Sequence, residues 1–412
     1  FQSAISAYKS QKLDQSIELA YKTLSLDPSH YMSFNLLGII SASKGDFKIA
    51  IEYFEKSLNI NKNVDVLNNQ ASAFTSIKNH TQAINNYNQI LDINPSNTKI
   101  LFDKGLLLNK IQKHREALEC YKQILCKEPD HIQAIHAQGT SFLSLKNYEK
   151  SLICYEKSIH LDPNNLTYLK NTIIAYLKIK DYKKSLFYCN KFISLNSNDH
   201  TILLNKGLSL INLGEDEEAI NSYKLALSIN PNNIDAIKNQ ANALWRLNKH
   251  KESLACYKQI LSIDPYNFGA LTSQAFIFEE LGRYKEALTS YDKASHINPN
   301  DATNKYNHSF CLLINGQLKK GFEFYEERWN INSPIFVKRN FKQPLWLGKQ
   351  DLTNKTLFIY PEQGFGDMIQ TYRYISKFNK LNTQVILKTH EPLQTLFLSN
   401  PSNNVTVTTK KT

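Results

Sequence analysis

The sequence has 412 residues, 42% hydrophobic and 21% charged, enough for two or three ordinary domains or one long repeat array. No apolar run approaches the ~18 residues that a membrane-spanning helix needs, so we expect no membrane span. Because the sequence begins with Phe1 rather than Met, we expect it to be a fragment. The sequence leaves open whether a signal peptide precedes it.

The net charge of +12 raises the question of a nucleic-acid partner. Only six of the basic residues are arginine, the side chain whose planar fork suits phosphates and base edges. The lysines are spread along the chain without forming a block, as on solvated helix faces. We therefore expect no nucleic-acid partner.

The six cysteines follow a period rather than a metal-binding pattern. Cys154 follows Cys120 by 34 positions, and Cys256 follows Cys154 by 102, three times that step. No CxxC or zinc-type spacing occurs. We interpret the cysteines as small buried residues of a protein in a reducing compartment, which predicts a cytoplasmic location and no metal site.

A period of about 34 residues runs through most of the chain. Four of the six steps between successive prolines are of 34 positions, and the other two are double steps of 67 and 68. A small residue stands twelve positions before each of these prolines. Eight positions before the proline there is usually an aromatic residue, and twenty-four positions before it there is usually Gly or Ala. This pattern resembles the tetratricopeptide family over about ten copies, from residue 1 to about 333. The prolines of the period are Pro28, Pro95, Pro129, Pro163, Pro231, Pro265 and Pro299.

One copy, residues 132–163, shows why the period predicts a fold. It contains two amphipathic helices of about 14 residues, neither of which can bury its apolar face alone. Gly139 and Ser151 are expected where the paired helices approach closely, with Tyr155 filling the gap to the next copy. Pro163 ends the second helix. Stacked copies predict an all-α superhelical solenoid over 1–333, with a concave groove lined by the first helix of each pair.

The sixth position of the first helices carries a row of polar residues. In the tetratricopeptide family this position faces the concave surface, so the resemblance implies a ladder of amides that binds the backbone of a protein or peptide. The alternative is that Asn is simply the commonest residue at this position. Leu36, Ala137 and Ser273 interrupt the row. Its members are Asn69, Asp103, Asn171, Asn205, Asn239 and Asn307.

After Trp329 the period stops, and residues 334–354 are predicted to be a linker. Strands are then expected at 356–360, 384–387 and 405–409, with helices at 367–378 and 392–398. Alternation of strand and helix is typical of a parallel α/β domain. Residues 355–412 therefore predict the start of a Rossmann-like domain that is incomplete in this sequence.

The segment after the first expected strand, 360–370, contains glycines just before a helix N-terminus, where backbone N–H groups favour anions. It is not a dinucleotide fingerprint, because Ile369 stands where the third glycine would be. We expect Glu362, Gln363, Gly364, Gly366 and Gln370 to form a loop that contacts a ligand.

Residues 321–400 resemble bacterial proteins in which tetratricopeptide repeats precede a glycosyltransferase-like domain of the two-Rossmann (GT-B) type, related to heptosyltransferases. The resemblance rests on Tyr325-Glu326-Glu327-Arg328-Trp329, Trp346-Leu347-Gly348 and the Glu-Gln-Gly-x-Gly-Asp run of 362–367.

The resemblance implies that Asp367 is a general base acting on a nucleotide sugar as donor substrate, with no other cofactor. The alternative role for Asp367 is a helix cap. The alternative function is a non-enzymatic interaction scaffold. Without a second nucleotide-binding half we expect the chain to be inactive by itself. The sequence leaves the donor sugar, the acceptor and the oligomeric state open.

Overall fold

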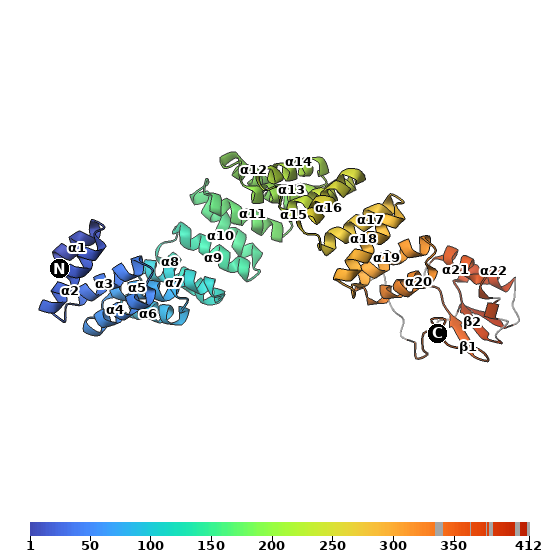
Figure 1. Ribbon diagram of the computed structural model, residues 1–412, viewed down its shortest axis with the longest axis horizontal. Coiled ribbons are helices and arrows are strands. Elements are labelled where there is room, and N and C mark those ends of the chain that lie inside the picture. The colour runs from blue at the N-terminus through green and yellow to red at the C-terminus, as the bar shows by residue number, and fades with distance from the viewer. Residues whose placement is uncertain (334–340, 363, 376, 379–381, 400–403, 410–412) are drawn as a thin grey trace. The chain divides into compact units, whose positions relative to one another are not determined.

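The computed structural model describes residues 1–333, 341–362, 364–375, 377–378, 382–399 and 404–409, and Figure 1 shows them as ribbons. The chain divides into two compact units, Phe1–Ile331 and Asn332–Thr412, which we describe separately. Among the described residues, no helix is both long and apolar enough to cross a membrane. Part of the predicted linker, residues 334–340, lies outside the described residues.

The first unit is a series of helix pairs, so the predicted helical repeat solenoid is confirmed. The first helices of the pairs are α1 (Gln2–Lys9), α3 (Tyr31–Ser43), α5 (Val64–Ser76), α7 (Thr98–Lys110), α9 (Ile132–Ser144), α11 (Leu166–Lys178), α13 (His200–Leu213), α15 (Ile234–Arg246), α17 (Phe268–Glu280) and α19 (Ala302–Ile314). The second helices are α2 (Leu13–Leu26), α4 (Phe47–Ile60), α6 (His80–Ile93), α8 (His114–Lys127), α10 (Tyr148–Leu161), α12 (Tyr182–Leu195), α14 (Asp216–Ile229), α16 (His250–Ile263), α18 (Tyr284–Ile297) and α20 (Leu318–Tyr325). A short 3-10 helix, η1 (Glu326–Asn330), follows the last pair.

Within a pair, a small residue on the first helix receives an aromatic ring from the second. A Cβ atom on Gly139 would lie 2.8 Å from the ring of Tyr155, and one on Gly207 would lie 2.4 Å from that of Tyr223. Tyr155 also packs with Ala175 and Tyr176 of the next pair, so its ring fills the space within its own pair and the space between the two pairs. The small residue predicted near the start of the second helix is fully buried, as at Ser151. Close packing of this kind makes the two helices of a pair one unit.

Polar side chains fix where each of the first helices from α3 to α19 begins. The residue before each helix accepts a hydrogen bond from a backbone N–H of the first turn, which satisfies a group that has no partner within the helix. Eight of the nine loops that precede these helices have four residues, and the loop between α4 and α5 has three. The capping residues are His30, Asn63, Asn97, His131, Asn165, Asp199, Asn233, Asn267 and Asp301.

The turn inside each pair uses one residue with positive φ, and these residues recur every 33 or 34 positions. Four of them are glycine, for which the left-handed region costs little. The others are Lys, Gln and Asn, which adopt it less readily. The ten positions are Gln11, Gly45, Lys78, Gln112, Lys146, Lys180, Gly214, Asn248, Gly282 and Gly316.

The first helices lie on the inner side of the stack. Six neighbouring pairs of first helices contact one another directly, for example α9 with α11 and α13 with α15. Within residues 1–333 no two successive second helices make a comparable contact. Helices that approach more closely lie on the shorter, inner side of a curved stack. We call the surface formed by the first helices the inner face and that formed by the second helices the outer face.

The second unit contains a small three-stranded parallel sheet in the order β1-β2-β3. Leu357 of β1 pairs with Val385 of β2, which pairs with Val405 of β3. Met368 and Phe397 belong to the core beneath the sheet. The elements in chain order are β1 (Thr356–Ile359), α21 (Phe365–Tyr372), β2 (Gln384–Lys388), the 3-10 helix η3 (Glu391–Leu393), α22 (Gln394–Leu398) and β3 (Val405–Thr408).

The three predicted strands are confirmed to within one residue, whereas the helix predicted at 367–378 is shorter than expected. It begins at Phe365 and ends at Tyr372. The chain then tightens into turns in which Tyr374 N–H donates to the carbonyl of Thr371 and Lys377 N–H to that of Tyr374. Bonds of this spacing are typical of 3-10 geometry, which often terminates an α-helix.

Candidate functional site

The predicted row of polar residues lies at the sixth position of the first helices, and every member is half-buried. Leu36 and Ala137, which interrupt the row, are buried instead. The polar members therefore retain contact with water although they lie between neighbouring first helices. The inner face carries the row Asn69, Asp103, Asn171, Asn205, Asn239 and Asn307.

Two members of the row are hydrogen-bonded to the preceding repeat. The amide nitrogen of Asn69 donates to the Asn35 side chain over 3.2 Å, and that of Asn171 lies 2.8 Å from Nε2 of His136. Asn35 and His136 both occupy the fifth position of the preceding first helix. At these two positions the amide therefore joins successive repeats.

Three other members form no side-chain hydrogen bond within residues 1–333. Asn205, Asn239 and Asn307 lack such a bond, and none of their amide atoms is sealed from water. An amide offers two donors and one acceptor, and a half-buried amide loses part of its hydration. These side chains leave hydrogen-bonding capacity open on the inner face.

Asp103 differs from the amides because it is ionisable. Burial raises the pKa of its carboxyl above the usual range, although the nearby Lys99 lowers it. The same carboxyl contributes, after burial itself, to raising the pKa of Tyr87 to about 12. The inner face is therefore not uniformly neutral at this repeat.

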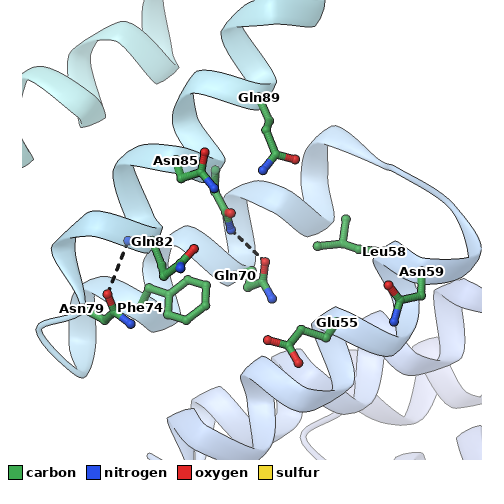
Figure 2. Close-up of a pocket in the computed structure, with 10 residues that line it drawn as sticks. Glu55, Leu58, Asn59, Gln70, Phe74, Asn79, Gln82, Asn85 and Gln89 are labelled. Atoms are coloured by element: carbon green, nitrogen blue, oxygen red, sulfur yellow. Dashed lines mark hydrogen bonds between the residues drawn. The ribbon is translucent and has the colours of Figure 1, made fainter.

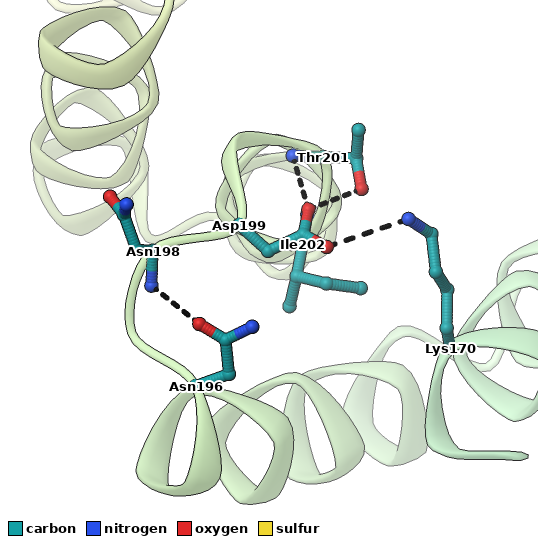
Figure 3. A network of polar contacts seen from close by, with 6 residues as sticks. All are labelled: Lys170, Asn196, Asn198, Asp199, Thr201 and Ile202. Carbon is teal, nitrogen blue, oxygen red and sulfur yellow. Dashed lines mark hydrogen bonds and ion pairs between the residues drawn. The ribbon is translucent and has the colours of Figure 1, made fainter. Parts of the chain in front are cut away.

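Lys170, at the fifth position of α11, is held by the next repeat (Figure 3). Its Nζ lies 3.5 Å from Asp199, whose other carboxylate oxygen accepts from the backbone N–H groups of Thr201 and Ile202 over 2.9 and 3.2 Å. Burial opposes ionisation of Asp199, yet these hydrogen bonds and the Thr201 hydroxyl together hold its pKa below the usual range. One carboxylate thus caps α13 and positions a cation on the inner face.

Apolar side chains complete the inner face. Trp245, at the twelfth position of α15, and Phe276, at the ninth position of α17, meet edge to face with ring centroids 5.7 Å apart. They are 36% and 39% exposed, and Leu106, at the ninth position of α7, is 45% exposed. Exposed aromatic surface beside free amides is typical of protein-binding surfaces.

Of the residues predicted to form the loop of the second unit, Glu362 and Gly364 lie between the end of β1 and the first residue of α21, whereas Gly366 and Gln370 lie within α21. Glu362, Gly364, Gly366 and Gln370 are exposed, and a Cβ atom on either glycine would meet nothing within 4 Å. Gly364 stands at the N-cap position of α21 with extended backbone, φ −67° and ψ 177°. The glycines leave open space at a helix N-terminus.

Two of the predicted site residues are not fully described. Gln363 lies outside the described residues. Asp367 belongs to α21 by its backbone, but its side chain lies outside the described residues.

Family models identify the repeats. Models of the tetratricopeptide repeat match residues 33–64, 200–233 and 238–302. A model of the tetratricopeptide-repeat region at the N-terminus of Psidin matches residues 74–202. The chain is a tetratricopeptide-repeat protein. The matches lie within the first unit, which is the part that the sequence predicted to contain the repeats.

Several solved structures are similar to parts of this tetratricopeptide-repeat protein at low sequence identity. YrrB, described as a tetratricopeptide-repeat protein with an unusual peptide-binding site, is 19% identical, with 46% of this chain and 97% of that chain covered and a TM-score of 0.42. MamA is 20% identical, with 42% and 94% covered and a TM-score of 0.40. A tetratricopeptide-repeat protein from Parabacteroides merdae ATCC 43184 is 19% identical, with 59% and 96% covered and a TM-score of 0.44. No curated protein matches the sequence.

Sequence reasoning about this tetratricopeptide-repeat protein missed the apolar part of the inner face. Ninth positions hold apolar residues in six of the nine first helices from α3 to α19, among them Leu106 and Phe276. That periodic signal was available, because the sixth and ninth positions of a helix lie on one side. The pairing of Trp245 with Phe276 depends on the stacking of two repeats, so no local pattern indicates it.

Proposed function

We propose that the inner face of the repeats binds an extended polypeptide. The observation that carries this proposal is the set of half-buried amides without a hydrogen-bond partner, Asn205, Asn239 and Asn307. Each lies on a first helix, so the three point their unused donors and acceptors along one face. An extended peptide backbone presents complementary N–H and C=O groups at regular intervals.

The flanking side chains favour a polypeptide over a small polar ligand. The Trp245–Phe276 pair offers apolar surface for one side chain, and Leu106 offers a second site several repeats away. Aromatic anchors contribute most of the binding energy in many interfaces, while backbone hydrogen bonds add affinity with little sequence preference. The tetratricopeptide-repeat protein would then select partners by the spacing of their apolar residues.

The decisive experiment replaces the open amides. A library of 15-residue peptides is screened against the chain, and the best binder is labelled for fluorescence anisotropy. Because each hydrogen bond is worth ~0.5–1.5 kcal/mol, changing Asn205, Asn239 and Asn307 together to Ala should weaken binding about tenfold or more. Helical content should stay unchanged, since none of the three amides bonds another residue.

The control removes amides from the outer face. Asn190 and Asn221 are exposed on α12 and α14, and their replacement by Ala should leave peptide affinity unchanged. Equal affinity of the triple variant and the unmodified chain would show that Asn is only the common residue at the sixth position. Equal losses in both variants would place the peptide elsewhere.

A second candidate function is glycosyl transfer from a nucleotide sugar, with the repeats presenting a protein or glycan acceptor. The observation that favours it is the open space around Gly364, which lies between β1 and α21, and around Gly366, the second residue of α21, next to a parallel sheet. Ligands of parallel α/β sheets bind at the carboxyl ends of strands, and helix N-termini favour phosphates. In this proposal Asp367 takes the proton from the acceptor hydroxyl.

The test of glycosyl transfer uses a chain that includes a second nucleotide-binding half. Release of nucleotide from several nucleotide sugars is measured with Asp367 and with Asp367→Asn. Asp367 lies in the first turn of α21, after the N-cap Gly364, so Asn should be tolerated there but cannot take up a proton. Turnover should therefore fall ~100-fold while the melting temperature stays nearly unchanged. Equal turnover would mean that Asp367 is not the general base and is only a residue of the first turn of α21. Absence of turnover in both forms would favour the non-enzymatic scaffold.

We also propose a cytoplasmic location. All six cysteines lie within the described residues and are free thiols, and five of them are buried. Free thiols are typical of reducing compartments. Labelling the protein in cell fractions tests this proposal, and recovery from a secreted fraction would contradict it.

A further inference from the structure

The outer face contains a pocket between α4 and α6, with α5 as its floor (Figure 2). Its volume is about 420 Å³, within the range of roughly 300–1,000 Å³ typical of small-ligand sites. It lies at the junction with the three-residue loop, 61–63, whereas the other junctions between repeats have four residues. None of the sixth-position residues of the proposed polypeptide site lines it, so the pocket is a separate site.

Carboxamides form most of the lining. Gln82, Asn85, Asn86 and Gln89 come from α6, and Asn79 precedes that helix. The second helices from α8 to α20 carry Lys or Glu where α6 has Gln82, at their third residue. The carboxamide at this position of α6 is therefore a local departure from the repeat rather than a general feature of it.

The floor is a fixed pair of buried amides. Asn86 Nδ2 donates to Gln70 Oε1 over 2.8 Å and to the carbonyl of Leu67 over 3.3 Å. Both side chains are 4% exposed. Because Gln70 uses its oxygen in this pair, its orientation is set and its amide N–H groups remain for a ligand. Figure 2 shows Gln70 at the centre of the pocket, with Glu55 of α4 on one side and the α6 side chains on the other.

The charges of the lining restrict the class of ligand. No Lys, Arg or His lines the pocket, so a phosphate or carboxylate would lose its hydration without gaining a cationic partner. The single charged group, Glu55, can only accept hydrogen bonds when ionised. Amides both donate and accept, as a hydroxyl group does. The Phe74 ring, which lies beside Asn79 and Gln82 in Figure 2, is only 9% exposed, so the accessible lining is dominated by polar groups.

We propose that this pocket binds a neutral carbohydrate, one or two sugar rings in size. Sugar hydroxyls both donate and accept hydrogen bonds, so they match the mixed donors and acceptors of the carboxamides. An extended polypeptide fits less well, because the carboxamide surface belongs to a single junction and the next outer helices are charged. The proposal therefore assigns different ligands to the two faces of the repeats.

The experiment uses the full chain and three neutral probes: maltotriose, cellotriose and tri-N-acetylchitotriose. Saturation-transfer NMR identifies which of them binds, and calorimetric titration gives the dissociation constant. Gln82 and Asn85 are exposed, so Gln82→Ala with Asn85→Ala should leave the melting temperature unchanged and weaken binding of the active probe about tenfold. Trigalacturonate, an anionic sugar of similar size, should not bind.

A matched control carries the same kinds of change elsewhere on the outer face. Gln123 of α8 and Asn221 of α14 are exposed, and their replacement by Ala should not alter sugar binding. Binding of at least one neutral probe that only the pocket variant weakens would support the proposal. Failure of all three probes, equal binding by the pocket variant, or preferential binding of trigalacturonate would overturn it. So would displacement of the sugar by an uncharged Gly/Ser peptide at lower concentration, which would indicate a polypeptide ligand.

Discussion

Tyr155 lies directly against Gly139, so that a Cβ atom added to Gly139 would be 2.8 Å from both Cδ1 and Cε1 of the ring and 3.0 Å from Cβ of Cys154. Both residues are buried in the interior of one repeat. The ring cannot move aside easily, because it also packs on Ala175 and Tyr176 of the next repeat. The contact therefore connects the packing within one pair to the packing between pairs.

The first prediction concerns this contact. Gly139→Leu should lower the free energy of unfolding by ~1–3 kcal/mol through overpacking, and Gly139→Ala by less. Other repeats accommodate Ala at the same position, for example Ala241 opposite Tyr257. Urea unfolding monitored by circular dichroism measures the difference. Gly269→Ala is the control, because a Cβ atom there meets only a side-chain oxygen at 3.6 Å and Ala favours the helix. Unaltered stability of Gly139→Leu would contradict the close contact.

The second prediction concerns pH. His136 packs between Tyr155 and Tyr168, and burial lowers its pKa to about 4. Burial likewise lowers the pKa of the fully buried His308 to about 4, against an opposing effect of Asp292. An unfolded histidine binds a proton near pH 6.5, so stability should fall as the pH drops from about 6.5 to 4 and then level off for these groups. Each histidine should account for on the order of 2–3 kcal/mol.

Urea unfolding at several pH values measures this loss. His136→Gln should make the pH dependence between 6.5 and 4 shallower, since only His308 of these two histidines then gains a proton on unfolding. His160→Gln replaces an exposed histidine and should leave the profile as it is. Identical profiles for the unmodified chain and His136→Gln would show that His136 is protonated in the folded state.

The third prediction concerns thiol reactivity. Cys126 is the exposed cysteine, while burial raises the pKa of Cys154 and Cys256 to about 11 and of Cys189 and Cys311 to about 12. Thiolates are the reactive form, so the native protein should show one fast-reacting thiol toward a disulfide reagent at pH 8. Cys126→Ser should remove that phase. Several fast thiols in the unmodified protein would contradict the burial of the others.

The fourth prediction separates the two roles of Asp199. Asp199→Ala should cost ~0.5–2 kcal/mol, the usual value of a lost N-cap. Asp199→Asn should cost much less, because Asn caps five of the other first helices and a partly exposed ion pair such as that with Lys170 is worth ~0–1 kcal/mol. Thermal melting compares the variants. Equal losses for Ala and Asn would mean that the ion pair with Lys170 matters more than the cap.

Much of the fold could be predicted because the period of about 34 residues fixes both helices of each pair and the small residues between them. The left-handed residue in each turn was harder to predict. Gly214 and Gly282 indicate it, but Lys146 and Lys180 adopt the same conformation without a local signal. Backbone geometry imposed by two packed helices overrides residue preference there.

The candidate sites were predictable only in part, because side chains from different repeats complete them. The sixth-position amides were evident from the sequence. Their hydrogen bonding was not, because Asn171 bonds to His136 whereas Asn205 has no side-chain hydrogen bond, and the residue at the fifth position of the preceding first helix differs between the two. The pocket on the outer face combines Glu55, Gln70 and Gln82 from three helices. A run of carboxamides in α6 was its one local signal.

The left-handed turn residues recur every 33 or 34 positions, once in each helix pair. The array can therefore be lengthened or shortened most easily by entire helix pairs. Removing residues 132–165 would take out one pair with its loop and join the loop after α8 to α11 without altering the spacing of the turns. Removing a single residue inside a helix would instead rotate everything on one side of it by about 100° relative to the other. Gain or loss of entire pairs is therefore the change in length that this architecture tolerates most easily.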